Sequence, residues 1–299
     1  MDVVGLGYCS LDYLGIVPGR PEFDVDTVSL SDFAKSGGGP VSTALVALAR
    51  LGACTGYIGV LGEDEGGAFL KGEFEQEGVD LNRLRVQAGA RSQTCMVLVE
   101  AGTGRRSILC YRAAGELLLD EADRAYISSA RYLHLDGNHM DAAITAACWA
   151  RADGVKVSFD ANRPRRRLDE LLPLVDILIA SERFPPAYTG KEDQVPAGRS
   201  LLEMGPEIVV ITLGARGCLC LWENQVIHVP GFQVDVVDST GAGDAFHGAF
   251  LYGLLQGWEL GRTAIFANAV AAINCTRLSG RAGLPSLSEV EVFLKEKAH

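Results

Sequence analysis

The sequence has few of the features that mark a membrane protein or a nucleic-acid-binding protein. No apolar run approaches the roughly 20 residues that a membrane span needs, so we expect no membrane contact. The 299 residues carry a formal net charge of −11, which argues against a nucleic-acid partner, because such surfaces need a basic stripe. The opening residues MDVVGLG lack the basic segment of a signal peptide and predict a strand instead. We therefore expect a cytoplasmic protein. The negative charge does not exclude a small anionic ligand, because a pocket can be locally positive.

No two of the eight cysteines have the CxxC spacing of a zinc or redox site. Cys218 and Cys220 alternate along a predicted strand and so share one face of it, but no second pair of cysteines or histidines accompanies them. We expect reduced cysteines, as in most cytosolic proteins, and no zinc site.

Two common nucleotide-binding signatures are also missing. The chain has no GxxxxGK[ST] motif, so a Walker loop is not the means of holding phosphate. Gly5-Leu6-Gly7 matches the start of GxGxxG, but Ser10 stands where the third glycine should be and no helical pattern follows. A Rossmann dinucleotide site is therefore not favoured.

The chain does contain a regular alternation of strand and helix patterns. This alternation predicts a parallel sheet with helices on both faces, whose ligands bind beyond the carboxyl ends of the strands. Two β-prone runs, 94–100 and 106–111, form a predicted hairpin, and with the excursion after Asp12 they could make a small separate sheet. The predicted main strands and the polar residues at their ends are 132–135 before Asp136-Gly137-Asn138, 155–159 before Asp160-Ala161-Asn162-Arg163, 177–180 before Ser181-Glu182, and 208–211 before Thr212-Leu213-Gly214.

The stretch 236–250 begins as a short β-type run, passes through Gly241-Ala242-Gly243 and continues as a helix. The small residues let backbone N–H groups converge at the start of that helix, where the helix dipole is positive, so the turn suits an anion such as phosphate. Asp244 is unexpected here, because a carboxylate repels an anion. It is either a capping residue of the turn or a base that takes the proton of an attacking hydroxyl.

A second glycine-rich segment, Ser36-Gly37-Gly38-Gly39-Pro40, precedes a predicted helix over 41–51. Three glycines allow the backbone to approach a ligand closely. The segment is equally compatible with a tight turn alone.

Together these motifs resemble a known family. DSTGAGD, from Asp238 to Asp244, resembles the C-terminal signature of the ribokinase-like (PfkB) sugar kinases, and GGGPVSTALVALARLG, from Gly37 to Gly52, resembles their N-terminal signature. FDANRPRR, ITLGARG and GRAGLP follow in the family's order, so the resemblance covers essentially the whole chain. It implies one domain over 1–299, a three-layer α/β/α sandwich with a mainly parallel central sheet, and a small β-sheet lid formed by about 12–35 and 91–113.

The resemblance also implies an activity: transfer of the γ-phosphoryl group of ATP to a hydroxyl of a sugar or sugar-like substrate. The implied cofactors are ATP and Mg²⁺, with K⁺ as a candidate monovalent cation, and the implied assembly is a homodimer through the lid. The carried-over residues are Asp244 as base with Gly241, Ala242 and Gly243 as anion hole; Asp12, Gly37, Gly38, Gly39, Thr43, Asn138 and Arg163 for the acceptor; Thr212, Gly214, Gly217 and Asn268 for the nucleotide; and Asp238 and Thr240 for the cation.

The sequence departs from the family pattern at two places. Thr43 replaces an Asn that often touches the sugar, and Ser181-Glu182-Arg183-Phe184 replaces the NxxE motif that helps to organise Mg²⁺. Glu182 is a candidate substitute for the missing Glu. Arginines near the acceptor side, Arg163 above all, favour an acidic or phosphorylated sugar, because a guanidinium matches carboxylate or phosphate. The alternatives are a nucleoside or sugar-phosphate kinase of the same fold, or a sugar-binding regulator without turnover.

Overall fold

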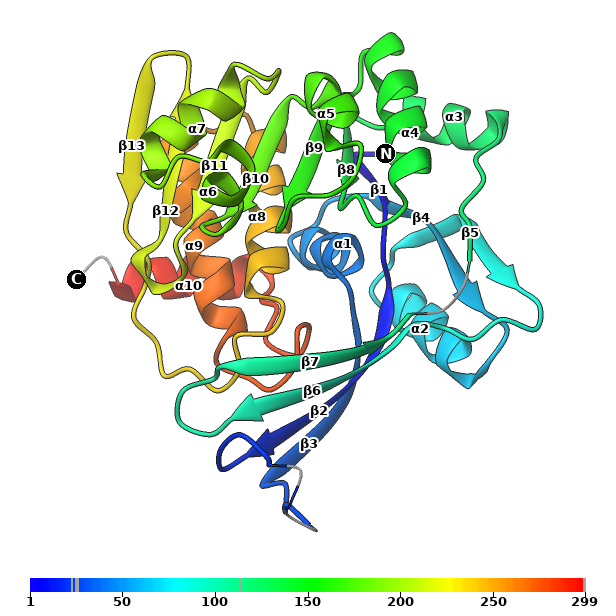
Figure 1. Ribbon diagram of the computed structural model, residues 1–299, viewed down its shortest axis with the longest axis vertical. Helices are drawn as coiled ribbons and strands as arrows, with labels where there is room; N and C mark the ends of the chain where they lie inside the picture. The colour runs from blue at the N-terminus through cyan, green and yellow to red at the C-terminus, as the bar shows by residue number, and fades with distance from the viewer. Residues whose placement is uncertain (23, 25–26, 113–114, 298–299) are drawn as a thin grey trace.

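The computed structural model describes all residues except 23, 25–26, 113–114 and 298–299, so small parts of the predicted lid segments lie outside the described residues. A nine-stranded sheet runs through the molecule in the order β13-β12-β11-β10-β9-β8-β1-β4-β5 (Figure 1). Its pairs are parallel except for β11–β12 and β12–β13, which are antiparallel. The strands are β1 (Val3–Leu6), β4 (Thr55–Gly62), β5 (Asp80–Gln87), β8 (Tyr132–Leu135), β9 (Lys156–Ala161), β10 (Ile177–Ser181), β11 (Ile208–Thr212), β12 (Cys218–Trp222) and β13 (Gln225–Val229).

Helices cover both faces of this sheet, because its strands are apolar on both sides. Val3 and Val4 are neighbours on β1, both fully buried, and they belong to separate hydrophobic clusters on opposite faces. The predicted three-layer α/β/α fold class is therefore confirmed. One face carries α1 (Pro40–Arg50), α2 (Glu65–Gln76), α8 (Ala242–Leu255) and α9 (Leu260–Asn274), with α10 (Leu287–Lys297) against α9; the other carries α3 (Glu121–Ser128), α4 (Met140–Ala152), α5 (Leu168–Leu171), α6 (Phe184–Thr189) and α7 (Gln194–Leu202).

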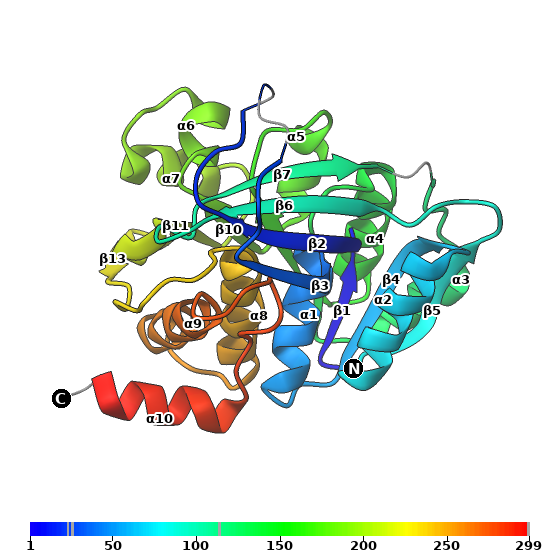
Figure 2. The ribbon, with the colours of Figure 1, turned by 90° about the horizontal axis from the view of Figure 1, so that it is seen from below.

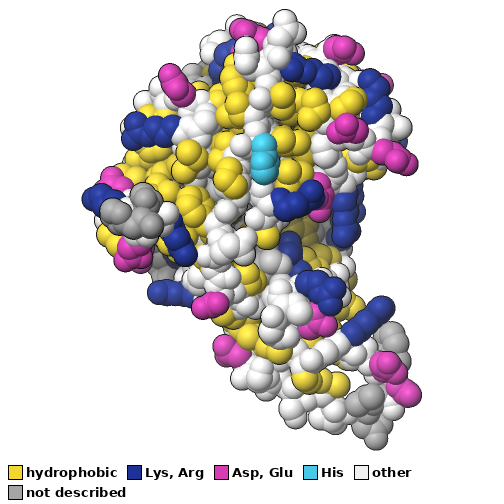
Figure 3. Space-filling view, turned by 90° about the vertical axis from the view of Figure 1, so that its left-hand side faces the viewer, with side chains coloured by type: hydrophobic (Ala, Val, Ile, Leu, Met, Phe, Trp, Pro, Cys, Tyr) yellow, Lys and Arg dark blue, Asp and Glu magenta, His cyan; other side chains and the backbone are white. Residues whose placement is uncertain are grey.

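A second, four-stranded sheet has the order β3-β2-β6-β7 and is called the lid below. It consists of β2 (Ser10–Val17), β3 (Asp32–Gly38), β6 (Thr94–Glu100) and β7 (Arg106–Tyr111). Figure 2 looks at the main domain through this sheet. Figure 3 shows it projecting below the main domain, and basic and acidic side chains are interspersed on the face seen there.

Several predicted elements need correction. The predicted strand start at Val236-Val237 is wrong: the segment before α8 has no strand, and the Val237 N–H donates instead to the Cys275 carbonyl at 2.9 Å. The strand β5 and the helix α3 were not predicted. Both have few apolar residues, so their hydrophobic patterns are weak. The strand β5 lies at the edge of the sheet and has the sequence DLNRLRVQ, and in α3 only Asp123 and Ile127 are buried.

The expectation of reduced cysteines is wrong for one pair. Cys95 of β6 and Cys110 of β7 lie directly opposite each other in the lid and form a disulfide. The other six cysteines are free, and Cys218 and Cys220 share a buried face of β12 as predicted.

Candidate active site

The helix α8 begins at the glycine-rich turn as predicted. Gly241 is its N-cap residue with φ of 73°, a left-handed conformation that glycine adopts without strain. Ala242 and Gly243 are the first residues of the helix, and Asp244 lies in its first turn. The first N–H groups of a helix have no partner within it and are available to an anion. Here the Ala242 N–H makes a long bond of 3.4 Å to the Ser239 carbonyl, while those of Gly241 and Gly243 have no backbone acceptor among the described residues.

A backbone contact fixes this turn from behind. A Cβ atom on Gly241 would lie 2.6 Å from the Cα and from the carbonyl oxygen of Gly280. Any side chain at Gly241 would therefore collide with backbone atoms, which cannot move aside as a flexible side chain can. The segment after α9 thus supports the anion turn through bare backbone.

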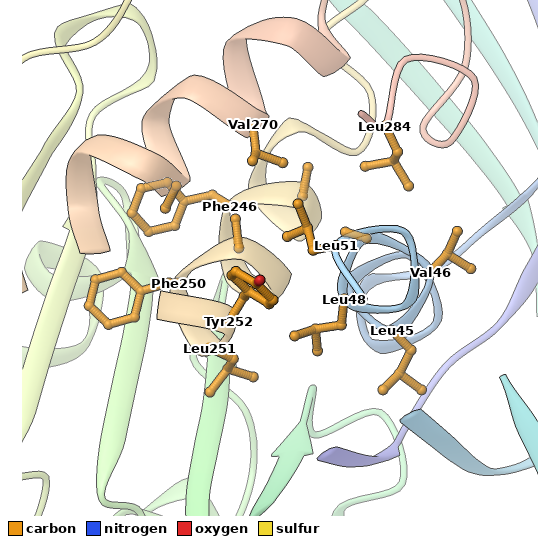
Figure 4. Packing of buried hydrophobic residues seen from close by; sticks show 14 of the residues in the cluster. Leu45, Val46, Leu48, Leu51, Phe246, Phe250, Leu251, Tyr252, Val270 and Leu284 are labelled. Atoms are coloured by element: carbon orange, nitrogen blue, oxygen red, sulfur yellow. The ribbon is translucent and has the colours of Figure 1, made fainter. Parts of the chain in front are cut away.

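The helices α1 and α8 pack against each other and bring their N-termini to the same end of the sheet. Their contact is close because Gly248 has no side chain: a Cβ there would lie 2.4 Å from the carbonyl oxygen of Ala44. Figure 4 shows Leu48 on the side of α1 that faces α8, near Leu251 and Tyr252. Two helix N-termini, each preceded by glycine, therefore line one site.

The second glycine-rich segment is only partly a turn. Gly37 and Gly38 end strand β3, and Gly39, with φ of 101°, is the N-cap residue of α1. The carboxylate of Asp12 lies against Gly38, where a Cβ would be 2.0 Å from its Oδ2 atom. Gly38 therefore has to be glycine for Asp12 to keep its place, and the predicted acceptor residues of the two strands are brought together.

Two carboxylates of the site have raised pKa values. Burial raises the pKa of Asp244 to about 6, while the charge of Arg106 opposes that rise. Burial likewise raises the pKa of Asp12 to about 6, against the hydrogen bond that it accepts from the Ser10 hydroxyl at 2.7 Å. The negative charge of Asp244 adds to the rise of the pKa at Asp12, so the two carboxylates lie near each other in the site.

Arg281 is a buried residue of the site that the sequence did not single out. Its side chain is 3% exposed, and its Nη1 atom donates to Oε2 of Glu73 at 3.1 Å. Its Nε atom lies 3.5 Å from the hydroxyl of Thr43, which is itself fully buried on α1. Thr43, predicted to contact the acceptor, therefore contacts Arg281. The GRAGLP motif that contains Arg281 was recognised, but its arginine had no assigned role.

The end of β8 forms the neighbouring wall. Asp136 is fully buried and accepts from the backbone N–H groups of Tyr8 at 2.8 Å and Asn138 at 2.9 Å. The Oδ1 atom of Asn138 accepts from Nη1 of Arg165 at 3.1 Å. Arg163, the predicted arginine, is exposed, whereas Arg165 is half-buried and contacts a predicted acceptor residue.

A cavity of about 310 Å³ lies on the other side of the anion turn. It is bounded on one side by Ala242 and Gly243, so the cavity and the anion turn are continuous. The four predicted nucleotide residues, Thr212, Gly214, Gly217 and Asn268, all line this cavity.

Asp238 and Thr240 lie beside the anion turn. Asp238 is fully buried, and its carboxylate accepts from the N–H and hydroxyl of Thr240 at 2.8 and 2.7 Å and from the N–H of Ser279 at 3.0 Å. The side-chain oxygen of Asn274, whose amide nitrogen donates to the Thr240 carbonyl, is buried without a hydrogen-bond partner among the described residues. Carboxylate, carbonyl and amide oxygens of this kind suit a hard cation, and the family resemblance makes K⁺ the candidate.

The altered NxxE segment is engaged elsewhere. Glu182 forms an ion pair with Arg216, and Phe184 is buried and stacks on Tyr188. In the described part of the chain, no three His, Cys, Asp or Glu side chains are grouped so that they could share a metal ion.

A helix N-terminus suited to an anion, with a carboxylate in its first turn, lies beside a cavity of about 310 Å³ and a polar pocket, and this arrangement suits a phosphotransferase. The fold is that of the ribokinase-like enzymes: a putative ribokinase from Agrobacterium tumefaciens superposes with a TM-score of 0.90 at 24% identity, covering 100% of this chain and 99% of that one. The chain matches the model of the pfkB family carbohydrate kinase over residues 2–287, and it belongs to that family. The predictions of the family and of a carbohydrate kinase are thus confirmed.

Two relatives illustrate the range of the family. An ATP-dependent ribose-1-phosphate kinase of Halopiger xanaduensis is 31% identical over 298 residues, covering 99% of this chain and 98% of the relative. A putative ribokinase II from E. coli, solved in complex with ATP and Mg²⁺, has a TM-score of 0.87 and 26% identity, with 99% of both chains covered. No helix in the described part of the chain is both long and apolar enough to cross a bilayer.

Proposed function

We propose that the protein transfers the γ-phosphoryl group of ATP to a hydroxyl of a sugar or sugar-like acceptor. The observation that carries this proposal is the position of Asp244, in the first turn of α8, between the cavity and Asp12. In the reaction, the acceptor oxygen bonds to the γ-phosphorus, the bond from that phosphorus to the bridging oxygen breaks, and ADP leaves. Asp244 takes the proton of the attacking hydroxyl, and the amides of Gly241, Ala242 and Gly243 stabilise the charge on the phosphoryl oxygens.

ATP fits the cavity, in our proposal, with its base toward Asn268 and its phosphates toward Gly243. The E. coli relative solved with ATP and Mg²⁺ supports both ligands. Mg²⁺ would be held by the phosphates themselves, with water as its other ligands, as is usual for this ion in kinases. Its contribution is to neutralise phosphate charge as ADP departs.

The acceptor site would be formed by Asp12, by Gly37, Gly38 and Gly39, and by Asn138. Asp12 and the backbone of this segment would bind sugar hydroxyls. Thr43 would act by holding Arg281, since its hydroxyl faces that side chain.

We further propose that the acceptor carries an anionic group near Arg165. This side chain is half-buried beside Asn138. Burial is the largest cause that lowers its pKa, and the charges of Arg163 and Arg112 act in the same direction, while those of Asp136 and Asp160 oppose it. None of these three arginines has an ion-pair partner among the described residues, so their charge is available to a ligand. A sugar acid or a sugar phosphate fits such a cluster.

A panel of neutral sugars, sugar acids, sugar phosphates and nucleosides with Mg-ATP, read by ADP release, tests these proposals. ADP release with any of the sugars supports the kinase, and preference for an anionic sugar supports the role of Arg165. A preference for nucleosides would contradict the acceptor class. A rise in melting temperature with a sugar, without ADP release from any acceptor, would favour the regulator instead.

The cation site is proposed at Asp238 and Thr240, with Asn274 as a further donor. Its support is the unpaired buried oxygen of Asn274, which a cation would satisfy. We expect turnover in K⁺ to exceed turnover in Na⁺ or Tris, and equal rates in all three would contradict the site.

We propose that the chain is one kinase domain whose lid, segments 12–35 and 91–113, covers the acceptor and pairs with the lid of a second copy. The support is an apolar outer face, on which Phe33, Met96, Leu109 and Tyr111 are each more than half exposed. Such a face is unusual on a monomer. Sedimentation of the wild type should give a dimer, and Met96→Lys should give a monomer; a monomeric wild type would contradict the proposal.

The cytoplasm is the proposed location, because ATP is the phosphoryl donor. The Cys95–Cys110 disulfide argues against it, since disulfides are rare in the cytosol. Fractionation of cells followed by immunodetection tests the location.

A further inference from the structure

The tip of the lid rests on the segment that leads into the anion turn. The carbonyl oxygen of Gly104, in the turn between β6 and β7, accepts from the N–H of Ser239 at 3.2 Å and from its hydroxyl at 2.7 Å. Gly104 is buried although its neighbours in the turn are exposed, and a Cβ there would lie 2.5 Å from the Val236 side chain. Thr103 of the same turn lines the nucleotide cavity. The lid therefore reaches the phosphate end of the site as well as the acceptor end.

Arg106 is the first residue of β7 after this turn. Its Nη1 atom donates to the Ser239 hydroxyl at 2.9 Å, and no carboxylate among the described residues pairs with it. Its neighbour Arg105 differs, since it forms an ion pair with Glu100 at 2.9 Å and is 79% exposed. A guanidinium has five N–H donors, so Arg106 keeps most of its donors for another ligand.

The register of the lid places Arg106 on the face that looks toward the main domain. Arg106 is opposite Val99, and Val99 is opposite Ile16, while Asp12 is opposite Cys95 on the same face. Asp12 and Arg106 therefore share one face of the sheet at its two ends. The charge of Arg106 is also the strongest of those acting on Asp244, so its guanidinium lies near the proposed base.

We propose that Arg106 is a further catalytic residue, which the lid brings to the transferring phosphoryl group. This inference rests on the proposed function. The phosphoryl group gathers negative charge on its three peripheral oxygens as the bond to ADP breaks and the acceptor oxygen bonds. The Ser239 hydroxyl orients the guanidinium, and its unused N–H groups bind those oxygens opposite the amides of Gly243.

Through Arg106, the lid would contribute to catalysis in addition to excluding water. Without the lid in this position, the donors that our proposal places at the phosphoryl oxygens, among the described residues, are the backbone amides of the anion turn, aided by the helix dipole. With the lid in place, a full positive charge is added at the point where the transition state needs it.

The test compares Arg106→Gln with its sequence neighbour Arg105→Gln as the matched control. We expect Arg106→Gln to lower kcat by about 100-fold or more, in the range of other arginines that contact a transferring phosphoryl group, while the KM for the acceptor changes little. Arg105→Gln should stay within about twofold of the wild type, since its guanidinium only pairs with an exposed carboxylate. Arg106→Lys should recover part of the loss, because it restores charge without the planar fork.

Nucleotide affinity by calorimetry gives a second readout that needs no acceptor. Arg106→Gln should weaken binding of the non-hydrolysable analogue AMP-PNP and leave binding of ADP unchanged, since only the former has a γ-phosphate group. Ser239→Ala keeps the charge but removes its anchor, and should give an intermediate loss of kcat. A wild-type kcat and AMP-PNP affinity in Arg106→Gln would overturn the role of Arg106 while leaving the kinase proposal intact. If the wild type released no ADP with any acceptor, the proposed function would fail, and the affinity comparison would still decide whether Arg106 binds the γ-phosphate.

Discussion

Arg281 donates a hydrogen bond from Nη2 to the carbonyl oxygen of Gly38, over 3.3 Å. The two residues are far apart in the chain, one after α9 and the other at the end of β3. Since Gly280, the residue before Arg281, contacts Gly241, this arginine links the anion turn to the glycine-rich segment that we propose for the acceptor.

Replacement of Arg281 should therefore damage both stability and acceptor binding. Arg281→Met leaves Glu73 without its buried partner, and we expect a loss of about 2–3 kcal/mol, below the usual 3–5 kcal/mol because the Glu73 side chain is partly exposed. The KM for the acceptor should rise as Gly38 loses its donor. Urea unfolding and steady-state kinetics measure the two effects. The exposed Arg277 is the control, and an equal loss in Arg277→Met would show that the effect is not specific to the buried pair.

Replacement of each of two helical glycines with alanine should change the free energy of unfolding in opposite directions. Helix propensity alone predicts a gain of up to about 1 kcal/mol at each. Gly72→Ala in α2 should show that gain, because its Cβ meets no atom within 4 Å. Gly248→Ala in α8 should instead lose about 1–3 kcal/mol, since its Cβ would press on the Ala44 carbonyl and push α1 away. A gain in free energy of unfolding at both positions would refute the close contact between α1 and α8.

Asp244→Asn tests the base. We expect kcat to fall by about 10²–10⁴-fold, because an amide cannot accept the hydroxyl proton, with nucleotide affinity nearly unchanged. Asp235→Asn, an exposed carboxylate on the segment before the anion turn, should be close to the wild type. A near-normal kcat in Asp244→Asn would remove Asp244 from the mechanism.

The pH dependence of activity follows from the same carboxylates. Burial raises the pKa of Asp244 and of Asp12 to about 6, so each is ionised above that pH and protonated below it. The value of kcat/KM should fall below pH 6 by about tenfold per pH unit if Asp244 alone controls it, and more steeply if Asp12 also contributes. Asp12→Asn should then make the fall less steep. A profile that stays flat down to pH 4.5 would contradict the raised pKa values.

Stability should respond to pH in the opposite direction. A carboxylic acid whose pKa is higher in the folded state than in the unfolded state binds its proton more tightly when folded, so its contribution to stability is lost as pH rises through about 6. Asp244→Asn should therefore be more stable than the wild type at pH 8, by on the order of 1 kcal/mol because the carboxylate is only partly buried. The difference should shrink by pH 5, and urea unfolding at both values measures it. Equal differences at pH 5 and pH 8 would argue against the linkage.

The sequence was sufficient for those parts of the site that depend on local backbone geometry. Glycine-rich turns before apolar helices identify Gly39 and Gly241 without tertiary information, and the polar ends of parallel strands identify Asn138 and Thr212. The hairpin of β6 and β7 was predicted with its correct bounds. A glycine-containing turn between two segments of alternating apolar residues is compatible with few structures other than a hairpin.

The missed residues act across distances that the sequence does not reveal. Arg281 contacts Glu73 and Gly38 only after α1, α2 and the segment following α9 have packed together. Arg163 and Arg165 are two residues apart in one basic run, and only the fold shows that Arg165 meets Asn138. Val236-Val237 has β-prone side chains, but no strand pairs with it in the part of the chain that the structure describes, so propensity alone gave the wrong structure.

The contact between Gly241 and Gly280 has a consequence for how such an enzyme can evolve. The anion turn of the proposed site acts through backbone amides, whose chemistry most substitutions leave unchanged, and Gly280 supports that turn from behind. The proposed acceptor end includes side chains such as Asn138 and Arg165, which single substitutions can replace. Selection for a new acceptor can therefore act on these side chains while the anion turn is kept.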